Sequence, residues 1–394
     1  MKKIIVLAMA LLLALATISA FADNEHKSGL FTYDLKKNGT AVITGYDWNN
    51  SEGDVIIPAI IDGYSVVAID DYAFQVESGL SSSYKKTIVT IPDSIISIGK
   101  CAFTNAGISS INIPNSLQSI GDGAFCQMFS NIRENLQFRI DPNHPNFAVV
   151  DGCLYNKTEK KLLFAPRVGV NIPIGILAIG DYVFRDTYPT SQDSGREYKL
   201  PSTLVSIGDY AFAFAGNEAD YLEVEIPEGT TTIGTHAFEG FNGTIIMGTT
   251  SIKSIPDYAF YNVVSPYSYV LSNSTPIEIS NPQYIESIGV YNNSLGKAFI
   301  DASCFSPSIT TIPTGFNPAT TELPDTITTI DSRAYTGKVV DLKLPSSITS
   351  IAEDAFPQGS TFIVEAGSYA QRWADENGFA YTVEGQGNLD WLNN

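Results

Sequence analysis

Residue types that often perform catalysis are present in this 394-residue sequence, but no catalytic motif surrounds them. The three histidines are His26, His144 and His236, and no G-x-S-x-G, H-E-x-x-H or phosphate-loop motif occurs. Because catalysis needs polar groups that converge in one pocket, we predict that the histidines are scaffold residues, and that the chain is not an enzyme and has no cofactor or metal. Asp and Glu total 42, so a carbohydrate-active enzyme with paired carboxylates is the remaining catalytic alternative.

The four cysteines do not form a metal-binding pattern. They are Cys101, Cys126, Cys153 and Cys304, and their spacing fits no zinc motif. We expect small, buried, hydrophobic side chains. A bridge between Cys101 and Cys126 stays open, because both flank the same motif in neighbouring repeats.

Tyrosines and acidic residues are the best candidates for a binding site. Five tyrosines lie in an insert from Tyr261 to Tyr291, and tyrosine is common in contact surfaces because it is amphipathic and loses little entropy when immobilised. Alternating charges face outward from the expected strands. The predicted ligand-binding residues are Tyr261, Tyr267, Tyr269, Glu223, Glu225, Glu322, Asp341 and Lys343. The alternatives are a solvated face for the charges and loop padding for the tyrosines.

The net charge of −19 excludes one large class of partners. Nucleic-acid affinity depends on Lys and Arg that displace counterions, so we expect no nucleic-acid partner. Only 16% of the residues are charged and 44% are hydrophobic, which favours a well-buried core.

The first 22 residues have the pattern of a secretory signal peptide. Lys2 and Lys3 precede an apolar run, and Ala20 and Ala22 give an A-x-A cleavage pattern before Asp23. The run is short for a membrane span. We therefore expect a secreted, extracellular protein that does not insert into a membrane after cleavage, with association at the cell surface as an option.

One phrase recurs along the chain, and this repeat is the main signal. It reads IPDSIISIGKCAF from Ile91 and LPSTLVSIGDYAF from Leu200, and ten copies fall within residues 57–357. An alternating run before the Pro predicts a strand, and a second short extended piece follows. The Gly is expected to turn the chain with positive φ. The final aromatic residues are expected to stack in one buried spine that includes Phe125, Phe212 and Phe238.

The two ends and one internal segment differ from the repeat. Residues 23–56 predict a β-hairpin cap, with Asn38-Gly39 as its turn. Residues 358–384 predict a C-terminal cap with a helix from Tyr369 to about Asn377, which Ser368 begins and Gly378 ends. Residues 138–167 form a variant module, and residues 385–394 are expected to be a flexible tail.

The repeated IP-x-x-[I/L]-x-x-IG-x-x-AF phrase and the end modules resemble the BspA-like leucine-rich-repeat family of surface proteins. The resemblance implies a leucine-rich-repeat solenoid of the α/β horseshoe class, rich in β-structure: a curved, right-handed parallel β-solenoid. It also implies adhesion to a host or microbial surface protein or glycan, and it supplies no catalytic residues. The alternative function is a non-catalytic structural surface component.

Overall fold

The structure is a computed structural model, and it describes residues 25–76, 86–126, 133–188, 196–216, 222–248, 251–264 and 277–385. The predicted signal peptide and residues 386–394 of the predicted tail lie outside these ranges. The chain divides into two compact units. Unit 1 ends at Ile132 and also includes Gln137–His144, and unit 2 contains Arg133–Leu136 and everything from Pro145 onward.

Unit 1 begins with the predicted hairpin. Strands β1 (His26–Ser28), β2 (Phe31–Leu35) and β3 (Thr40–Tyr46) pair antiparallel in that order. Gly39 forms the turn with a φ of 78°, a conformation that glycine adopts without steric penalty. Strand β3 then pairs in parallel with β6 (Tyr64–Ile69), so the hairpin covers the edge of the first repeat.

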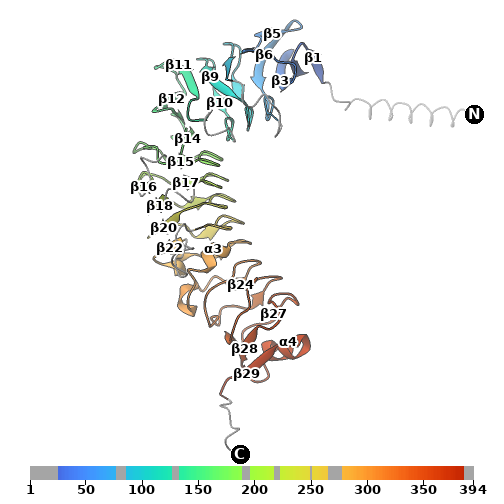
Figure 1. The fold of residues 1–394 in the computed structure, drawn as a ribbon, viewed down its shortest axis with the longest axis vertical. Helices are drawn as coiled ribbons and strands as arrows, with labels where there is room; N and C mark the ends of the chain where they lie inside the picture. The colour runs from blue at the N-terminus through green and yellow to red at the C-terminus, as the bar shows by residue number, and fades with distance from the viewer. Residues whose placement is uncertain are drawn as a thin grey trace, which may run out of the picture. The chain divides into compact units, whose positions relative to one another are not determined.

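Each coil of unit 1 supplies one strand to each of two parallel sheets (Figure 1). The strands that precede the proline form one sheet, which contains the two-residue β4 (Val55–Ile56) and the longer strands β7 (Thr87–Thr90), β9 (Ile108–Ile113) and β11 (Gln137–Ile140). The strands that precede the turn extend the hairpin sheet through the six-residue β6 and the two-residue strands β8 (Ser97–Ile98) and β10 (Ser119–Ile120). β5 (Ile60–Ile61) pairs with β6 beside this path.

Unit 2 opens with the variant module. Its strands β12 (Phe147–Val150), β13 (Cys153–Asn156) and β14 (Lys161–Phe164) pair antiparallel, so this module differs from the parallel repeats on both sides. β14 then pairs in parallel with β15 (Ala178–Ile179), and the regular coils resume.

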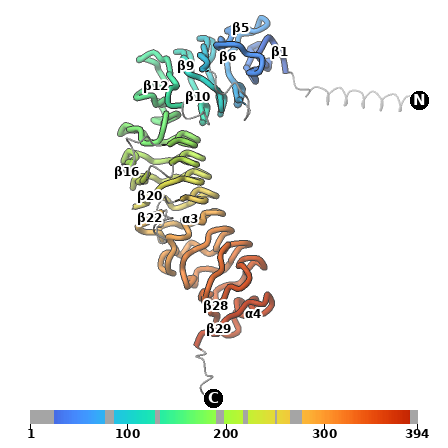
Figure 2. Tube along the Cα trace, in the orientation of Figure 1, coloured from blue at the N-terminus to red at the C-terminus, as the bar shows by residue number. Residues whose placement is uncertain are grey.

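The regular coils of unit 2 stack in chain order (Figure 2). Their longer strands are β16 (Arg196–Lys199), β18 (Leu222–Ile226), β20 (Thr244–Met247), β22 (Ile277–Ile279), β26 (Leu342–Leu344), β28 (Thr361–Val364) and β29 (Ala380–Val383). Their shorter strands after β15 are β17 (Ser206–Ile207), β19 (Thr232–Ile233), β21 (Ser254–Ile255), β23 (Ser287–Ile288), β24 (Thr311–Ile312), β25 (Thr329–Ile330) and β27 (Ser350–Ile351).

Two details of the repeat prediction were wrong. The insert from Tyr261 to Tyr291 is not one loop, because β22 and β23 lie within it and make a coil. The structure also adds a coil around β24, whose buried Phe316 comes one residue sooner after its isoleucine than in the repeated phrase. Because of this shorter spacing between the isoleucine and the phenylalanine, the copy was not recognised in the sequence.

Among the described residues, the helices with assigned bounds are short and occur late in the chain. They are η4 (Pro282–Tyr284), α3 (Asn293–Gly296), η5 (Ala302–Cys304) and α4 (Tyr369–Asn377). Helix α4 has the predicted limits: the Ser368 hydroxyl accepts from the Gln371 N–H, and Gly378 ends the helix with a left-handed φ of 74°. Its buried face includes Trp373, which stacks on Phe379 at the end of the last coil.

The core is a column of stacked phenylalanines in each unit. In unit 1 the ring centroids of Phe74 and Phe103 lie 5.0 Å apart, and those of Phe103 and Phe125 5.6 Å. In unit 2 the corresponding distances are 5.0 Å from Phe212 to Phe238 and 4.8 Å from Phe212 to Phe184. The predicted stacking is confirmed for Phe212 and Phe238 in unit 2, and Phe125 stacks in the same way on Phe103 in unit 1.

The glycine of the repeated phrase has a different role from the predicted one. Gly99, Gly121, Gly208 and Gly234 do not have positive φ. A Cβ added at Gly208 would lie 2.7 Å from the Asp181 nitrogen and 2.8 Å from the Gly180 carbonyl carbon in the coil before. Glycine is therefore needed because adjacent backbones approach too closely for a side chain.

Removing a ring from the phenylalanine column should destabilise unit 2 strongly. Phe212 is fully buried between two other rings, so Phe212→Ala should lower the free energy of unfolding by about 3–5 kcal/mol. The exposed Val205 is the control, and Val205→Ala should change stability by about 0.5 kcal/mol or less. Urea denaturation measures both, and equal small effects would contradict the column.

A methyl group at the close-approach glycine should also destabilise the fold. Gly208→Ala must push two coils apart, so we expect a loss of about 1–3 kcal/mol. The matched control is Gly248→Ala, because no atom lies within 4 Å of a Cβ at that position. If thermal denaturation showed the two variants to be equally stable, close packing would not explain the glycine.

Candidate functional site

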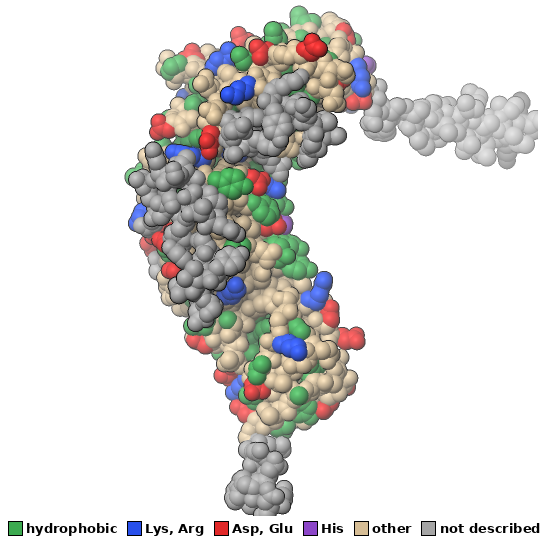
Figure 3. All heavy atoms as spheres, viewed as in Figure 1, with side chains coloured by type: hydrophobic (Ala, Val, Ile, Leu, Met, Phe, Trp, Pro, Cys, Tyr) green, Lys and Arg blue, Asp and Glu red, His purple; other side chains and the backbone are tan. Residues whose placement is uncertain are grey.

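The predicted acidic residues on β18 lie on its outer side. Glu223 and Glu225 are half-buried and alternate with the buried Val224. The Lys199 ammonium of β16 lies 3.5 Å from the Glu225 carboxylate. Acidic and basic side chains are similarly interspersed on the face in Figure 3.

The other predicted charges belong to a second cluster. The Lys343 ammonium lies 2.9 Å from Glu322 and 3.0 Å from Glu384, and these contacts, with Glu322 as the larger cause, raise the pKa of Lys343. Asp341 accepts a hydrogen bond from the Thr361 hydroxyl at 2.9 Å. These contacts between successive coils bind the repeats to one another.

Tyr261 is placed apart from the acidic strand residues. Its ring packs edge-on against Tyr258 and Tyr291, with centroids 5.5 and 6.0 Å away, in the turns that follow the short strands. Glu223 lies on a long strand in another part of the coil. Tyr267 and Tyr269 lie outside the described residues, so the joint patch stays a prediction.

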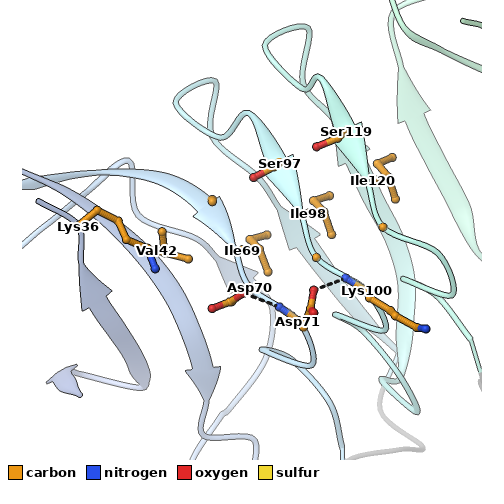
Figure 4. A pocket seen from close by; sticks show the side chains of 13 residues that line it. Lys36, Val42, Ile69, Asp70, Asp71, Ser97, Ile98, Lys100, Ser119 and Ile120 are labelled. Carbon is orange, nitrogen blue, oxygen red and sulfur yellow. Dashed lines mark hydrogen bonds between the residues drawn. The ribbon is translucent and has the colours of Figure 1, made fainter. Parts of the chain in front are cut away.

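A groove in unit 1 combines charged and apolar groups (Figure 4). Its volume is about 510 Å³, and its floor is a row of Ile69, Ile98 and Ile120 from three successive short strands. Asp71 at its edge accepts a hydrogen bond from the Lys100 N–H at 2.6 Å. That carboxylate is engaged by backbone in the next coil, which argues against a catalytic role.

The same aspartate contact recurs in unit 2. Asp181 accepts from the Asp209 N–H at 2.9 Å, and Asp209 accepts from the Thr235 N–H at 2.8 Å. Asp257 accepts from the Val290 N–H at 2.9 Å. The aspartate of the repeated phrase is therefore a structural clamp between coils.

Two histidines have structural surroundings. His144 is fully buried, and its Nε2 lies 2.9 Å from the Pro114 carbonyl oxygen. His26 stacks on Tyr33 with centroids 5.2 Å apart. Within the ranges that the structure describes, no group of three or more His, Cys, Asp or Glu residues is arranged to hold a metal ion.

Cys101 and Cys126 are buried neighbours in adjacent coils. They are free thiols whose sulfur atoms lie 3.7 Å apart. The hydrogen bond from Cys126 is the main cause that lowers the pKa of Cys101 to about 7. Burial instead raises the pKa of Cys153 to about 11.

An aromatic row that the sequence prediction missed crosses five coils of unit 2. We call it the aromatic ladder, and its members are Tyr182, Tyr210, His236, Tyr258 and Tyr291. Successive ring centroids lie 5.1, 4.5, 4.5 and 4.7 Å apart, and the rings are nearly parallel. All five residues are partly exposed.

The ladder residues hold an unfavourable backbone conformation. Their φ angles lie between 55° and 63°, which costs a non-glycine residue about 1–2 kcal/mol. A stacked aromatic pair contributes about 0.5–1.5 kcal/mol, so two neighbours roughly offset the penalty. Gly123 and Gly315 have positive φ in the corresponding turns, so the fold itself does not require a ring there.

Charged side chains flank the ladder. The Arg185 guanidinium lies 5.2 Å from the ring centroid of Tyr210, which is cation–π geometry. Arg333 donates to the Tyr291 hydroxyl at 3.5 Å. The His236 Nδ1 lies 2.8 Å from Glu239. The signal in the sequence is the residue two positions before the buried aromatic, which is Tyr or His in four successive copies of the phrase.

Family comparison agrees with this architecture. The family model described as "BspA type Leucine rich repeat region (6 copies)" matches residues 67–141, 178–311 and 314–369, which is more than half of the chain. The chain belongs to the BspA-type leucine-rich-repeat family. No curated protein is significantly similar to this BspA-type chain. Within its described residues, no helix is long and apolar enough to cross a membrane.

Solved structures of leucine-rich-repeat proteins are similar to this BspA-type protein. One from Eubacterium ventriosum is 18% identical, with a TM-score of 0.41, over 84% of this chain and 93% of that one. A leucine-rich cell surface protein of Faecalibacterium prausnitzii is 19% identical, with a TM-score of 0.37, over 95% and 98%. The pneumococcal vaccine antigen PcpA is 14% identical, with a TM-score of 0.35, over 92% and 98%.

The two thiols should differ in the pH dependence of alkylation. Both thiols are buried, so iodoacetamide should label them slowly; because the thiolate is the reactive form, the slow rate for Cys101 should rise through about pH 7, and that for Cys153 only towards pH 11. Timed labelling of the folded protein with peptide mass spectrometry measures both rates. Cys126→Ala, which removes the hydrogen-bond donor, should shift the Cys101 profile to higher pH, and an unchanged profile would show that Cys126 does not stabilise the thiolate.

Proposed function

We propose that this protein is a secreted, non-catalytic binding protein that acts in adhesion, and that its repeats present a surface to a protein or glycan of a host or another microbe. The observation that supports this most directly is the aromatic ladder. It keeps five rings partly exposed in a backbone conformation for which glycine would suffice. Strained, exposed aromatic residues are typical of functional surfaces.

The rigid coil array supports the same proposal. Each inner ladder residue donates its backbone N–H to the next coil; the Tyr210 N–H, for example, reaches the Thr235 carbonyl at 3.1 Å. The rings are therefore held in place before any ligand arrives. A preorganised surface loses less entropy on binding.

The acidic strand residues have a secondary place in the proposal. Glu223 and Glu225 are partly exposed on β18, and exposed charges mainly change the association rate and its salt dependence. They would act with Tyr261, Tyr267 and Tyr269 if the ligand spans both parts of the coil. Glu322, Asp341 and Lys343 would extend this surface towards the last coils.

The test is a binding screen against extracellular-matrix proteins and a glycan array, with two matched variants. Tyr210→Gly with Tyr258→Gly removes two rings and inserts the residue that corresponding turns already contain. For any ligand found, we expect at least tenfold weaker binding by this variant. Glu223→Gln with Glu225→Gln should mainly reduce the salt dependence. Equal binding by the ring-deleted and unaltered proteins would contradict a role for the ladder.

A further inference from the structure

The ladder offers ring edges and hydroxyl groups to a partner, because its ring faces are already in use. Each inner ring is covered on both faces by its neighbours at 4.5–5.1 Å. At the Tyr182–Tyr210 end the Arg185 guanidinium also lies over the rings. A ligand that needs an open aromatic face, as the flat side of a sugar ring does, would find none on the inner rungs.

The exposed polar groups along the ladder are mostly tyrosine hydroxyls, each of which can donate one hydrogen bond and can also accept. Among the described residues, neither the Tyr210 nor the Tyr258 hydroxyl has a hydrogen-bond partner. Burial and the nearby Tyr291 raise the pKa of Tyr258, so its hydroxyl keeps its proton. The neighbouring acceptor Glu239 is engaged by His236 at 2.8 Å. A partner with free acceptors at a matching spacing would complement the hydroxyl donors of this row.

A proline-rich peptide has this character. Proline has no N–H, and the polyproline II helix has no internal hydrogen bonds, so its carbonyl oxygens remain free. Sugars instead present hydroxyls that donate as well as accept. The carbonyl oxygens of the peptide can accept from the ladder hydroxyls, and the covered ring faces, which a sugar would need open, favour the peptide.

The spacing favours the same conformation. A polyproline II helix rises about 3.1 Å per residue with three residues per turn, so one turn of about 9.3 Å matches two ladder intervals of about 9 Å. An extended β-strand repeats every two residues, about 6.6–6.8 Å, and does not keep register with the rungs. A carbonyl on one side of the polyproline helix would meet every second rung, which is the separation of Tyr210 and Tyr258.

We infer that the aromatic ladder binds proline-rich peptide segments in the polyproline II conformation, with the Tyr210 and Tyr258 hydroxyls donating to peptide carbonyls one helical turn apart. The inference rests on the proposed function, because it names the partner class of the same surface. Arg185 and Arg333 extend the donor row towards its two ends.

The experiment is titration of the full chain with a fluorescent decaproline peptide and with a Gly-Ser peptide of equal length, which has no polyproline II preference. Tyr210→Phe with Tyr258→Phe removes two hydroxyls and keeps the stack. The control is Tyr284→Phe, since Tyr284 is 61% exposed outside the ladder. Thermal denaturation confirms that each variant is folded.

We expect saturable binding of decaproline only, at least about tenfold weaker in the double Phe variant because two hydrogen bonds are lost, and unchanged in Tyr284→Phe. Equal binding by the double Phe variant, or no decaproline binding, would overturn the inference. Decaproline could fail to bind while a glycan or another protein binds more weakly to the variant with Tyr210→Gly and Tyr258→Gly. In that case only the assignment of the ligand as a proline-rich peptide would be wrong. If no ligand depended on the ladder, the proposed function would fall as well.

Discussion

Backbone hydrogen bonding between successive coils sets the distance on which the other features of each unit depend. Parallel strands lie about 4.7–4.9 Å apart, and side chains at equivalent positions of adjacent coils inherit that spacing. Buried rings such as Phe184 and Phe212 stack at 4.8 Å, and the ladder rings at 4.5–5.1 Å. Both are close to the preferred separation of offset aromatic rings, so one residue type at one position becomes a continuous column.

Each position of the repeated phrase consequently has one physical task. Glycine permits close approach of two backbones, aspartate accepts an N–H from the next coil, and phenylalanine fills the interior. The residue two places before the phenylalanine is less constrained: it is Cys101, Gly123 or Tyr210 in different coils, and each of these three has a left-handed backbone. A position that the fold leaves free is where a binding surface can be built without loss of the core.

Much of the fold could be predicted from the sequence because local chemistry decides it. The Asn38-Gly39 turn and the Ser368 and Gly378 helix ends were read correctly. The coil around Phe316 was missed because its spacing is shorter by one residue. The glycine role was misassigned because a close approach between coils is not visible in a linear sequence.

The candidate site was harder to predict than the fold. The tyrosines were sought in an insert, where they are close in sequence, whereas the ladder brings together residues more than 20 positions apart. The tyrosine of the repeated phrase looked like part of the scaffold because it recurs. Only the register of the coils shows that these rings lie directly above one another.

The most direct test of the central claim, that side chains at this position form one ordered row on the protein surface, is photo-oxidative tyrosine cross-linking with peptide mapping. The account predicts dityrosine links between Tyr182 and Tyr210 and between Tyr258 and Tyr291, which are adjacent rungs. It predicts few links between Tyr210 and Tyr258, because His236 separates them. In the His236→Tyr variant, the new ring should form links to both Tyr210 and Tyr258. Links distributed without regard to coil order, or no links between adjacent rungs, would contradict it.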